Sequence, residues 1–198
     1  MTAQVKTMTV EEFWDEYAGK PYELIRGVPV LLGSKGTDSR KNGEALPTGY
    51  AHSDVEHLVS HHLGHFIDKN PLGRILVGEA GFQLAPDVLR AADIAFVSSE
   101  KLKTITEPQK YLPFAPDLAV EIVSPGDTSS EIQDKLDLYL EAGTRLVWIV
   151  YPDLRKVVTH DSTGRTKSLG VDQTVDGGDV LPGFQVPVRD LFPPPPNS

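Results

Sequence analysis

Residues 116–150 read PDLAVEIVSPGDTSSEIQDKLDLYLEAGTRLVWIV, and this stretch decides the fold. Residues 118–123 form an almost wholly apolar run, as expected of a strand in the centre of a sheet. Thr128 and Glu131 have the spacing of a capping box and predict a helix that runs to about Ala142, with Gly143 as its stop. The apolar run 146–150 predicts a second buried strand. The stretch is therefore a strand–helix–strand unit, typical of an α/β domain.

The segments around this unit predict further helices and hairpins. A capping box at Thr9 and Glu12 indicates a helix over 9–18, and a hairpin over 22–25 and 28–32 follows it. A second helix is expected from Ser53, as its N-cap, to Lys69. Strands are expected at 74–84, 91–97 and 156–160. Hairpins beside a strand–helix–strand unit predict a mixed central sheet flanked by helices.

Length and composition predict one globular domain over 1–192, followed by a disordered Pro-rich tail at 193–198. The chain has 198 residues, of which 39% are apolar and 24% charged, and such a chain buries roughly 70% of its unfolded surface. The absence of cysteine excludes a disulfide scaffold, thiol catalysis and Cys-ligated metal sites. No apolar run approaches the ~18 residues of a membrane span, and the start lacks a secretory signal. We therefore expect a cytoplasmic protein without a membrane partner.

The formal net charge is −9, which counts against a protein that coats nucleic acid non-specifically. It does not exclude an enzyme that meets nucleic acid through a bound divalent cation. Residues 33–49 form a long polar loop that carries Lys35, Arg40 and Lys41. A loop of this length is either functional or a tolerated insertion.

Five histidines lie close together in and before the second expected helix. His57, His61 and His65 share one helical face, a spacing that could bind zinc, but this face is opposite the apolar stripe and is expected to be solvated. His62 lies on the apolar side and is expected to be a core histidine. His52 precedes the expected helix start, where its ring could reach a neighbouring site.

Two carboxylates interrupt strands that should be buried, Glu121 in 118–123 and Asp93 in 91–97. A buried carboxylate must meet a cation or a donor, or become protonated. If the two are adjacent, an oxygen-liganded cation such as Mg²⁺ or Mn²⁺ removes their repulsion. The alternative is that each acid lies at a strand end, exposed or paired with an arginine.

Lys135 and Glu23 extend this set of candidate residues. Lys135 flanks the buried face of the helix after Glu121, so its ammonium either extends to water or lies near Glu121. Near a metal, it could orient a water or stabilise a phosphate in the transition state. Glu23 is a third acid among apolar strand residues, and it either completes the metal site or faces solvent.

The order of these motifs resembles that of the Uma-two family, a domain of unknown function placed in the PD-(D/E)XK nuclease superfamily. The matching stretches are 8–13, 22–27, the His52 helix start, 92–98, 116–125, 135–139, 142–143, 148–150 and 181–184. The resemblance spans about residues 8–192. It implies a restriction endonuclease-like α/β core with a two-carboxylate metal site.

Residue by residue, the resemblance makes Asp93 the motif aspartate, Glu121 the motif glutamate and Glu23 the upstream acid. The superfamily lysine usually lies two residues after the glutamate, where this chain has Val123, and the family supplies it from the next helix as Lys135. Ala92 stands where the family commonly has proline. Two pairs, at 86–87 and 116–117, have the letters Pro-Asp but are not expected to be the motif. The first lies in a polar turn, and the second is only four residues before Glu121, too close to belong to a separate strand.

The implied reaction is metal-assisted hydrolysis of DNA phosphodiester bonds. Asp93 and Glu121 would hold Mg²⁺, Lys135 would orient the attacking water, and Glu23 would hold a second metal or a metal-bound water. The basic loop could contact the DNA backbone. Duplex cleavage would suit a homodimer that presents one site to each strand.

Two other interpretations remain open at this stage. One is a non-catalytic nucleic-acid or protein interaction module that retains the fold, which the net charge favours. The other is a hydrolase of a different phosphate substrate. The presence of Asp93, Glu121 and Lys135 together favours the nuclease.

Overall fold

The computed structural model describes residues 7–32, 49–78 and 80–194, and its centre is a six-stranded sheet. The strand order is β10-β9-β8-β7-β6-β3, and only β7 and β8 run parallel within it. The strands are β3 (Gly73–Val77), β6 (Ile94–Ser98), β7 (Leu118–Ile122), β8 (Leu146–Tyr151), β9 (Lys156–Asp161) and β10 (Thr166–Leu169). The expectation of a mixed sheet is confirmed.

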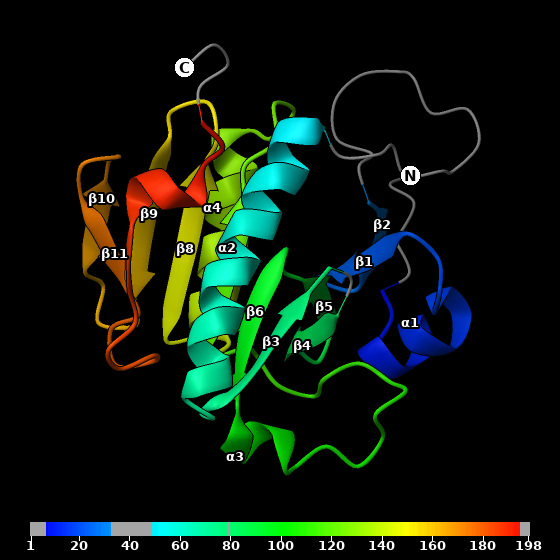
Figure 1. Ribbon diagram of the computed structural model, residues 1–198. Coiled ribbons are helices and arrows are strands. Elements are labelled where there is room, and N and C mark those ends of the chain that lie inside the picture. Colours follow the sequence, from blue (N-terminus) through cyan, green and yellow to red (C-terminus); the bar gives the residue numbers. More distant parts are fainter. Residues whose placement is uncertain (1–6, 33–48, 79, 195–198) are drawn as a thin grey trace.

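Helices α2 (Tyr50–Lys69) and α4 (Ser129–Glu141) cover opposite faces of this sheet, and Figure 1 shows α2 crossing the near face. Strand side chains alternate between the two faces. Val120 and Ile122 of β7 pack in the same cluster as Val59 of α2, whereas Ala119 packs with Tyr139 of α4. Glu121 therefore points toward α4.

A second, four-stranded sheet has the order β2-β1-β5-β4 and packs with the N-terminal helix. The helix is α1 (Val10–Tyr17). The strands are β1 (Tyr22–Ile25), β2 (Val28–Leu31), β4 (Gly81–Ala85) and β5 (Val88–Ala91). The expected helix and hairpin are confirmed, with the Thr9–Glu12 capping box present.

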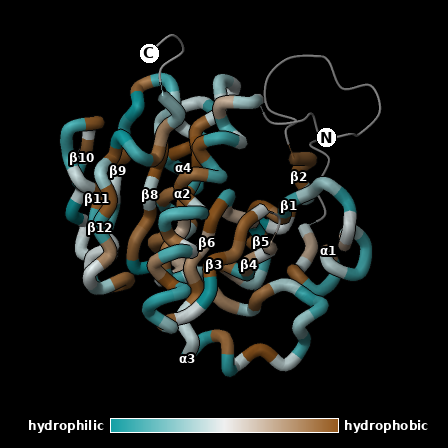
Figure 2. The backbone as a smooth tube through the Cα atoms, in the orientation of Figure 1, coloured by the Kyte–Doolittle hydropathy of each residue, from teal (hydrophilic) through white to brown (hydrophobic). Residues whose placement is uncertain are grey.

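Four short elements remain. They are α3 (Ser99–Leu102), β11 (Thr174–Asp176), β12 (Gln185–Pro187) and the 3₁₀ helix η1 (Val188–Leu191). Leu181, Leu191 and Phe192 are buried in the cluster beneath α2. In Figure 2 the apolar colour gathers on the strands at the centre of the molecule. No helix in the described ranges has both the length and the apolar character needed to cross a membrane.

Three expected boundaries are wrong. Helix α2 begins at Tyr50 with Gly49 as N-cap, so Ser53 is not the cap and His52 lies inside the first turn. The expected strand 74–84 is two strands in different sheets, because Gly78 turns the chain at a φ of 82°. The expected strand 91–97 likewise divides, since β5 ends at Ala91 and β6 begins at Ile94. Asp93 lies in that break rather than within a strand.

Two expectations fall on parts of the chain that the structure does not describe. The basic residues Lys35, Arg40 and Lys41 lie outside the described residues, as do 195–198 of the expected tail. At the start of that tail, Arg155 donates a hydrogen bond of 2.6 Å from Nη1 to the carbonyl of Pro193.

Candidate active site

Glu121 is buried in β7, and helix α4 holds both of its carboxylate oxygens. The ammonium of Lys135 donates to Oε2, and the hydroxyl of Tyr139 donates to Oε1 over 2.8 Å. Lys135 and Tyr139 are four residues apart, so they lie on one face of the helix. The capping box of Thr128 and Glu131 starts this helix as the sequence predicts.

The protonation of this group follows from its surroundings. Burial raises the pKa of the Glu121 carboxyl, Lys135 opposes this, and the charge of Asp93 adds to it. Burial alone would lower the pKa of Lys135, but the carboxylates of Glu121, Asp93 and Glu23 raise it above its ordinary value. Lys135 is therefore an ammonium at neutral pH, held by acids at the site rather than extended to water.

Asp93 lies in the break just before β6, at the end of β7 that holds Glu121. Ile94, the residue after Asp93, pairs with Val120, the residue before Glu121. Asp93 Oδ2 accepts a hydrogen bond of 2.6 Å from the backbone N–H of Ile122 and lies 3.5 Å from His52 Nε2. Its side chain is 27% exposed. Both contacts fall on Oδ2, which leaves Oδ1 available to a cation within the described part of the chain.

Helix α2 contributes His52 and Glu56 to the Asp93 side of the site. The hydrogen bond to Asp93 raises the pKa of His52, although burial opposes it. Burial and the charge of Asp93 raise the pKa of Glu56, one turn further along. The structure thus places His52 beside Asp93, and it does so from within the first turn of the helix rather than from before it.

Glu23 is paired with a buried arginine. Leu24 pairs with Leu89, and the continued register sets Glu23 opposite Arg90 on β5. Arg90 Nη2 lies 3.0 Å from Glu23 Oε2, and the backbone N–H of Ala91 donates to Oε1 over 3.1 Å. Both side chains are buried. Glu23 therefore faces the protein interior and not solvent.

The charges of the site leave a deficit of positive charge. Four carboxylates (Asp93, Glu121, Glu23 and Glu56) lie with two permanent cations (Lys135 and Arg90) and with His52, the imidazole beside Asp93. An all-oxygen set of donors suits Mg²⁺ or Mn²⁺ rather than a soft metal. No three His, Asp or Glu side chains in the described residues form a ready metal cage, but Mg²⁺ is usually held by one or two carboxylates with waters and substrate phosphate. Asp93 and Glu121 fit that requirement.

A cavity of about 10 Å³ lies beside Glu121 and Lys135, with Asp127 and Glu131 also in its lining. This volume is about the space that one water molecule needs. The lining is polar at Glu121 and Lys135, so a water there would have hydrogen-bond partners.

Sequence reasoning missed three members of this site. Tyr139 was given no role at the site, although its spacing of four from Lys135 was a usable signal. Glu56 is likewise four residues from His52. Arg90 could not be found locally, because its place depends on the pairing of β5 with β1.

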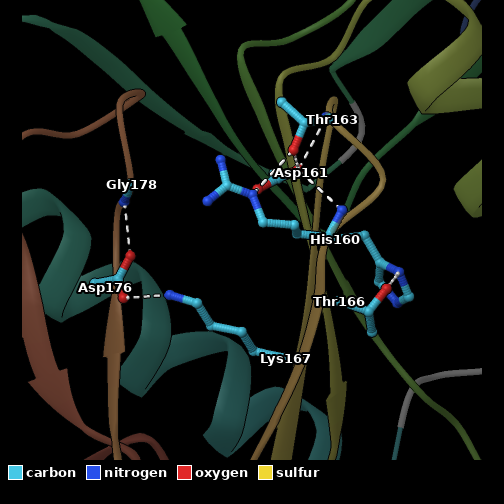
Figure 3. Close-up of polar contacts among 8 residues, drawn as sticks. His160, Asp161, Thr163, Thr166, Lys167, Asp176 and Gly178 are labelled. Atoms are coloured by element: carbon cyan, nitrogen blue, oxygen red, sulfur yellow. Dashed lines mark hydrogen bonds and ion pairs between the residues drawn. The ribbon is translucent and has the colours of Figure 1, made fainter.

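A larger cavity of about 290 Å³ lies at the opposite end of the sheet, near the start of β8. Figure 3 shows polar contacts in this region, where Lys167 Nζ lies 3.0 Å from Asp176 Oδ2. Arg165 similarly lies 3.3 Å from Asp161, and Arg145 lies 3.4 Å from Asp117. Each of these three cations lies within ion-pair distance of an acid. Asp117, of the second Pro-Asp pair, belongs to this end and not to the site.

Comparisons with known proteins agree with the geometry. The model of one family, Uma2, described as "Putative restriction endonuclease", matches residues 10–189. A crystal structure described as a "putative nuclease belonging to DUF820" from Anabaena variabilis is similar to the chain, with a TM-score of 0.74 and 20% identity. The similarity covers 93% of this chain and 97% of that one. The search of the curated proteins found no match. The restriction endonuclease-like fold is thereby confirmed.

Proposed function

Since the chain belongs to the Uma2 family, we propose that it is a metal-dependent endonuclease that hydrolyses phosphodiester bonds of DNA. The observation that carries the proposal is that Lys135 donates to Glu121 while Asp93, from the break before β6, accepts from the backbone N–H of Ile122, the residue after Glu121. A structural role alone would be served by an ion pair between Glu121 and Lys135. It would not require a second, partly exposed carboxylate beside them.

In this proposal, Asp93 and Glu121 hold Mg²⁺ or Mn²⁺. A bound cation would polarise the phosphate and lower the pKa of a water. Asp93 is oriented for this role by the backbone of Ile122 and by His52. Tyr139 and Lys135 fix Glu121 in one orientation, which reduces the reorganisation needed when the cation binds.

Lys135 supplies the fixed positive charge of the reaction. Its ammonium stabilises the charge that develops on the phosphate and orients the attacking water. Glu23 is proposed as the acid for a second metal or a metal-bound water, a role that requires its release from Arg90. Lys35, Arg40 and Lys41 remain proposed contacts to the DNA backbone, and a homodimer remains the proposed form for duplex cleavage.

Calorimetric titration of Mn²⁺ tests the metal site before a target sequence is known. Wild type should bind, while Glu121→Gln and Asp93→Asn should bind at least about tenfold more weakly, since each loses one charged ligand. Asp172→Asn, at an acid that is 93% exposed and remote in the sequence from the site, is the matched control. Circular dichroism shows whether each variant is folded.

The outcomes separate the proposals. Binding that Glu121→Gln retains at full strength would place the metal elsewhere and overturn the assignment of ligands. Absence of binding by wild type, both alone and with a short DNA duplex, would favour the interaction module. Cleavage of plasmid DNA with Mg²⁺, lost in Lys135→Met, would then establish the reaction itself.

A further inference from the structure

Three histidines form a row along the solvent face of α2, away from the carboxylates. His57, His61 and His65 are exposed and follow one another at intervals of four residues. The ring centroids of His57 and His61 are 6.2 Å apart, and those of His61 and His65 are 6.3 Å apart. The sequence predicts that this face is solvated, and the structure agrees.

This spacing is chemically specific. Two histidines four residues apart on a helix can ligate one metal ion, as in the helical zinc-binding pattern H-E-x-x-H. Ligation needs each ring nitrogen about 2.0–2.1 Å from the metal. Exposed side chains change rotamer within nanoseconds, so neighbouring rings at this separation can turn toward one ion without movement of the backbone.

The identity of the ligands determines the class of metal. Neutral imidazole suits Zn²⁺, Cu²⁺ and Ni²⁺, whereas Mg²⁺ prefers oxygen. Asp54, three residues before His57, and Asp68, three residues after His65, continue the row and add negative charge along the same face. The surroundings therefore favour a cation.

We propose that α2 carries a transition-metal site made of two histidines, His61 with either His57 or His65, separate from the site at Asp93 and Glu121. His61 is the shared member, because it lies one turn from each of the others. The remaining coordination positions are open to water, consistent with the lack of any three-residue metal group in the described residues. The proposal does not depend on nuclease activity.

The test is calorimetric titration of Ni²⁺ into the full chain, prepared without a histidine tag. Wild type should bind one ion on this face. His61→Ala should weaken binding by about 100-fold, because it removes the second ligand from both pairs and with it the chelate advantage. His57→Ala and His65→Ala should each retain binding within about twofold, since one pair survives. The double variant His57→Ala/His65→Ala should behave as His61→Ala.

Two controls complete the design. His160→Ala should leave the affinity unchanged, because His160 lies on β9 and bonds to Thr166, away from α2. Glu121→Gln should also bind Ni²⁺ as wild type does, which separates this site from the carboxylates. Wild-type affinity in His61→Ala, or a loss in Glu121→Gln that equals the loss expected for His61→Ala, would overturn the proposal.

Discussion

Glu121 shows how a single buried carboxylate depends on its donors. Its two oxygens are held by Lys135 and Tyr139, which lie one turn apart on α4. A buried acceptor that loses a donor pays a desolvation cost, and hydrogen bonds to charged groups contribute more than neutral ones. The stability of the site therefore rests on both residues of the helix.

We expect Tyr139→Phe to lower the free energy of unfolding by about 1.5–3 kcal/mol, because it removes a donor to a buried charged group. Urea denaturation measures the change. In a Glu121→Ala background the same substitution should cost much less, since the acceptor is already absent, giving a coupling of about 0.5–3 kcal/mol. Strictly additive effects would show that the hydroxyl does not stabilise the carboxylate.

The cross-strand pair of Glu23 and Arg90 gives a second expectation at this scale. Arg90→Met should destabilise the protein by about 3–5 kcal/mol, because it leaves a buried acid without its cation. The double variant Glu23→Leu/Arg90→Met should recover most of that loss, since a buried pair can be replaced by apolar groups at little net cost. Denaturation curves of the three proteins decide this, and a double variant no more stable than Arg90→Met would contradict it.

At the scale of elements, the parts that could be predicted are those with local signals. Both capping boxes place a helix start correctly, because the side chain and the backbone that it caps are three residues apart. Helix α2 begins at Tyr50, and its N-cap Gly49 has no side chain to form a capping hydrogen bond, so nothing local marked the start and Ser53 was mistaken for the cap.

The site was also predictable only in part, because only some of its residues have a local signal in the sequence. Glu121 and Asp93 were detectable as acids within apolar runs, and Lys135 by its place in the next helix. The division of 74–84 between two sheets was hidden, because apolar residues continue on both sides of Gly78. The role of Arg90 depends on the pairing of β5 with β1. These strands are far apart in the sequence, since Glu23 and Ala91, which they bring into contact, are 68 residues apart.

Strand β7 is anchored at its start by Asp117, and this anchor should give acid sensitivity. Asp117 Oδ2 accepts a hydrogen bond of 2.8 Å from the backbone N–H of Ser98, and Oδ1 lies 3.2 Å from Lys101 Nζ. Burial would raise the pKa of Asp117, but the Ser98 bond and the charge of Lys101 together lower it below its ordinary value of 3.8.

A lowered folded-state pKa means that Asp117 stabilises the protein above the unfolded-state value, and that this is lost as the pH falls through the folded-state value. We expect Asp117→Asn to cost about 1.5–3 kcal/mol at pH 7. The difference from wild type should stay constant down to about pH 5 and shrink below about pH 4. Urea unfolding across this range measures it, with Asp172→Asn as an exposed control. A difference that does not vary with pH would show that the charge is not what matters.

On the scale of the whole molecule, the first and last described elements pack against different parts of the core. The N-terminal hairpin β1–β2 pairs with β5 in the second sheet, and this sheet supplies Glu23 and Arg90 to the site. The C-terminal residues Leu191 and Phe192 close the core on the α2 side. The site is thus assembled from β1, β5, α2, β7 and α4, together with the break before β6, and no single segment contains it.

The net charge of −9 bears on how such a molecule could meet DNA. A polyanion is repelled by a protein with excess acid, and non-specific affinity for DNA comes mainly from basic residues. The acids at Asp93, Glu121 and Glu23 concentrate this repulsion at the proposed site. A divalent cation between carboxylates and phosphate would reverse the local sign.

We therefore expect DNA binding to depend on a divalent cation. In EDTA, fluorescence anisotropy of a labelled duplex should show no binding at micromolar protein, and Ca²⁺, which takes oxygen ligands as Mg²⁺ does, should restore it. Glu121→Gln and Asp93→Asn should fail to respond to Ca²⁺, because the cation must be held by the protein and not merely screen its charge. Binding that persists in EDTA, or that Ca²⁺ restores equally in these variants, would show that DNA is held elsewhere and would favour the interaction module over the nuclease.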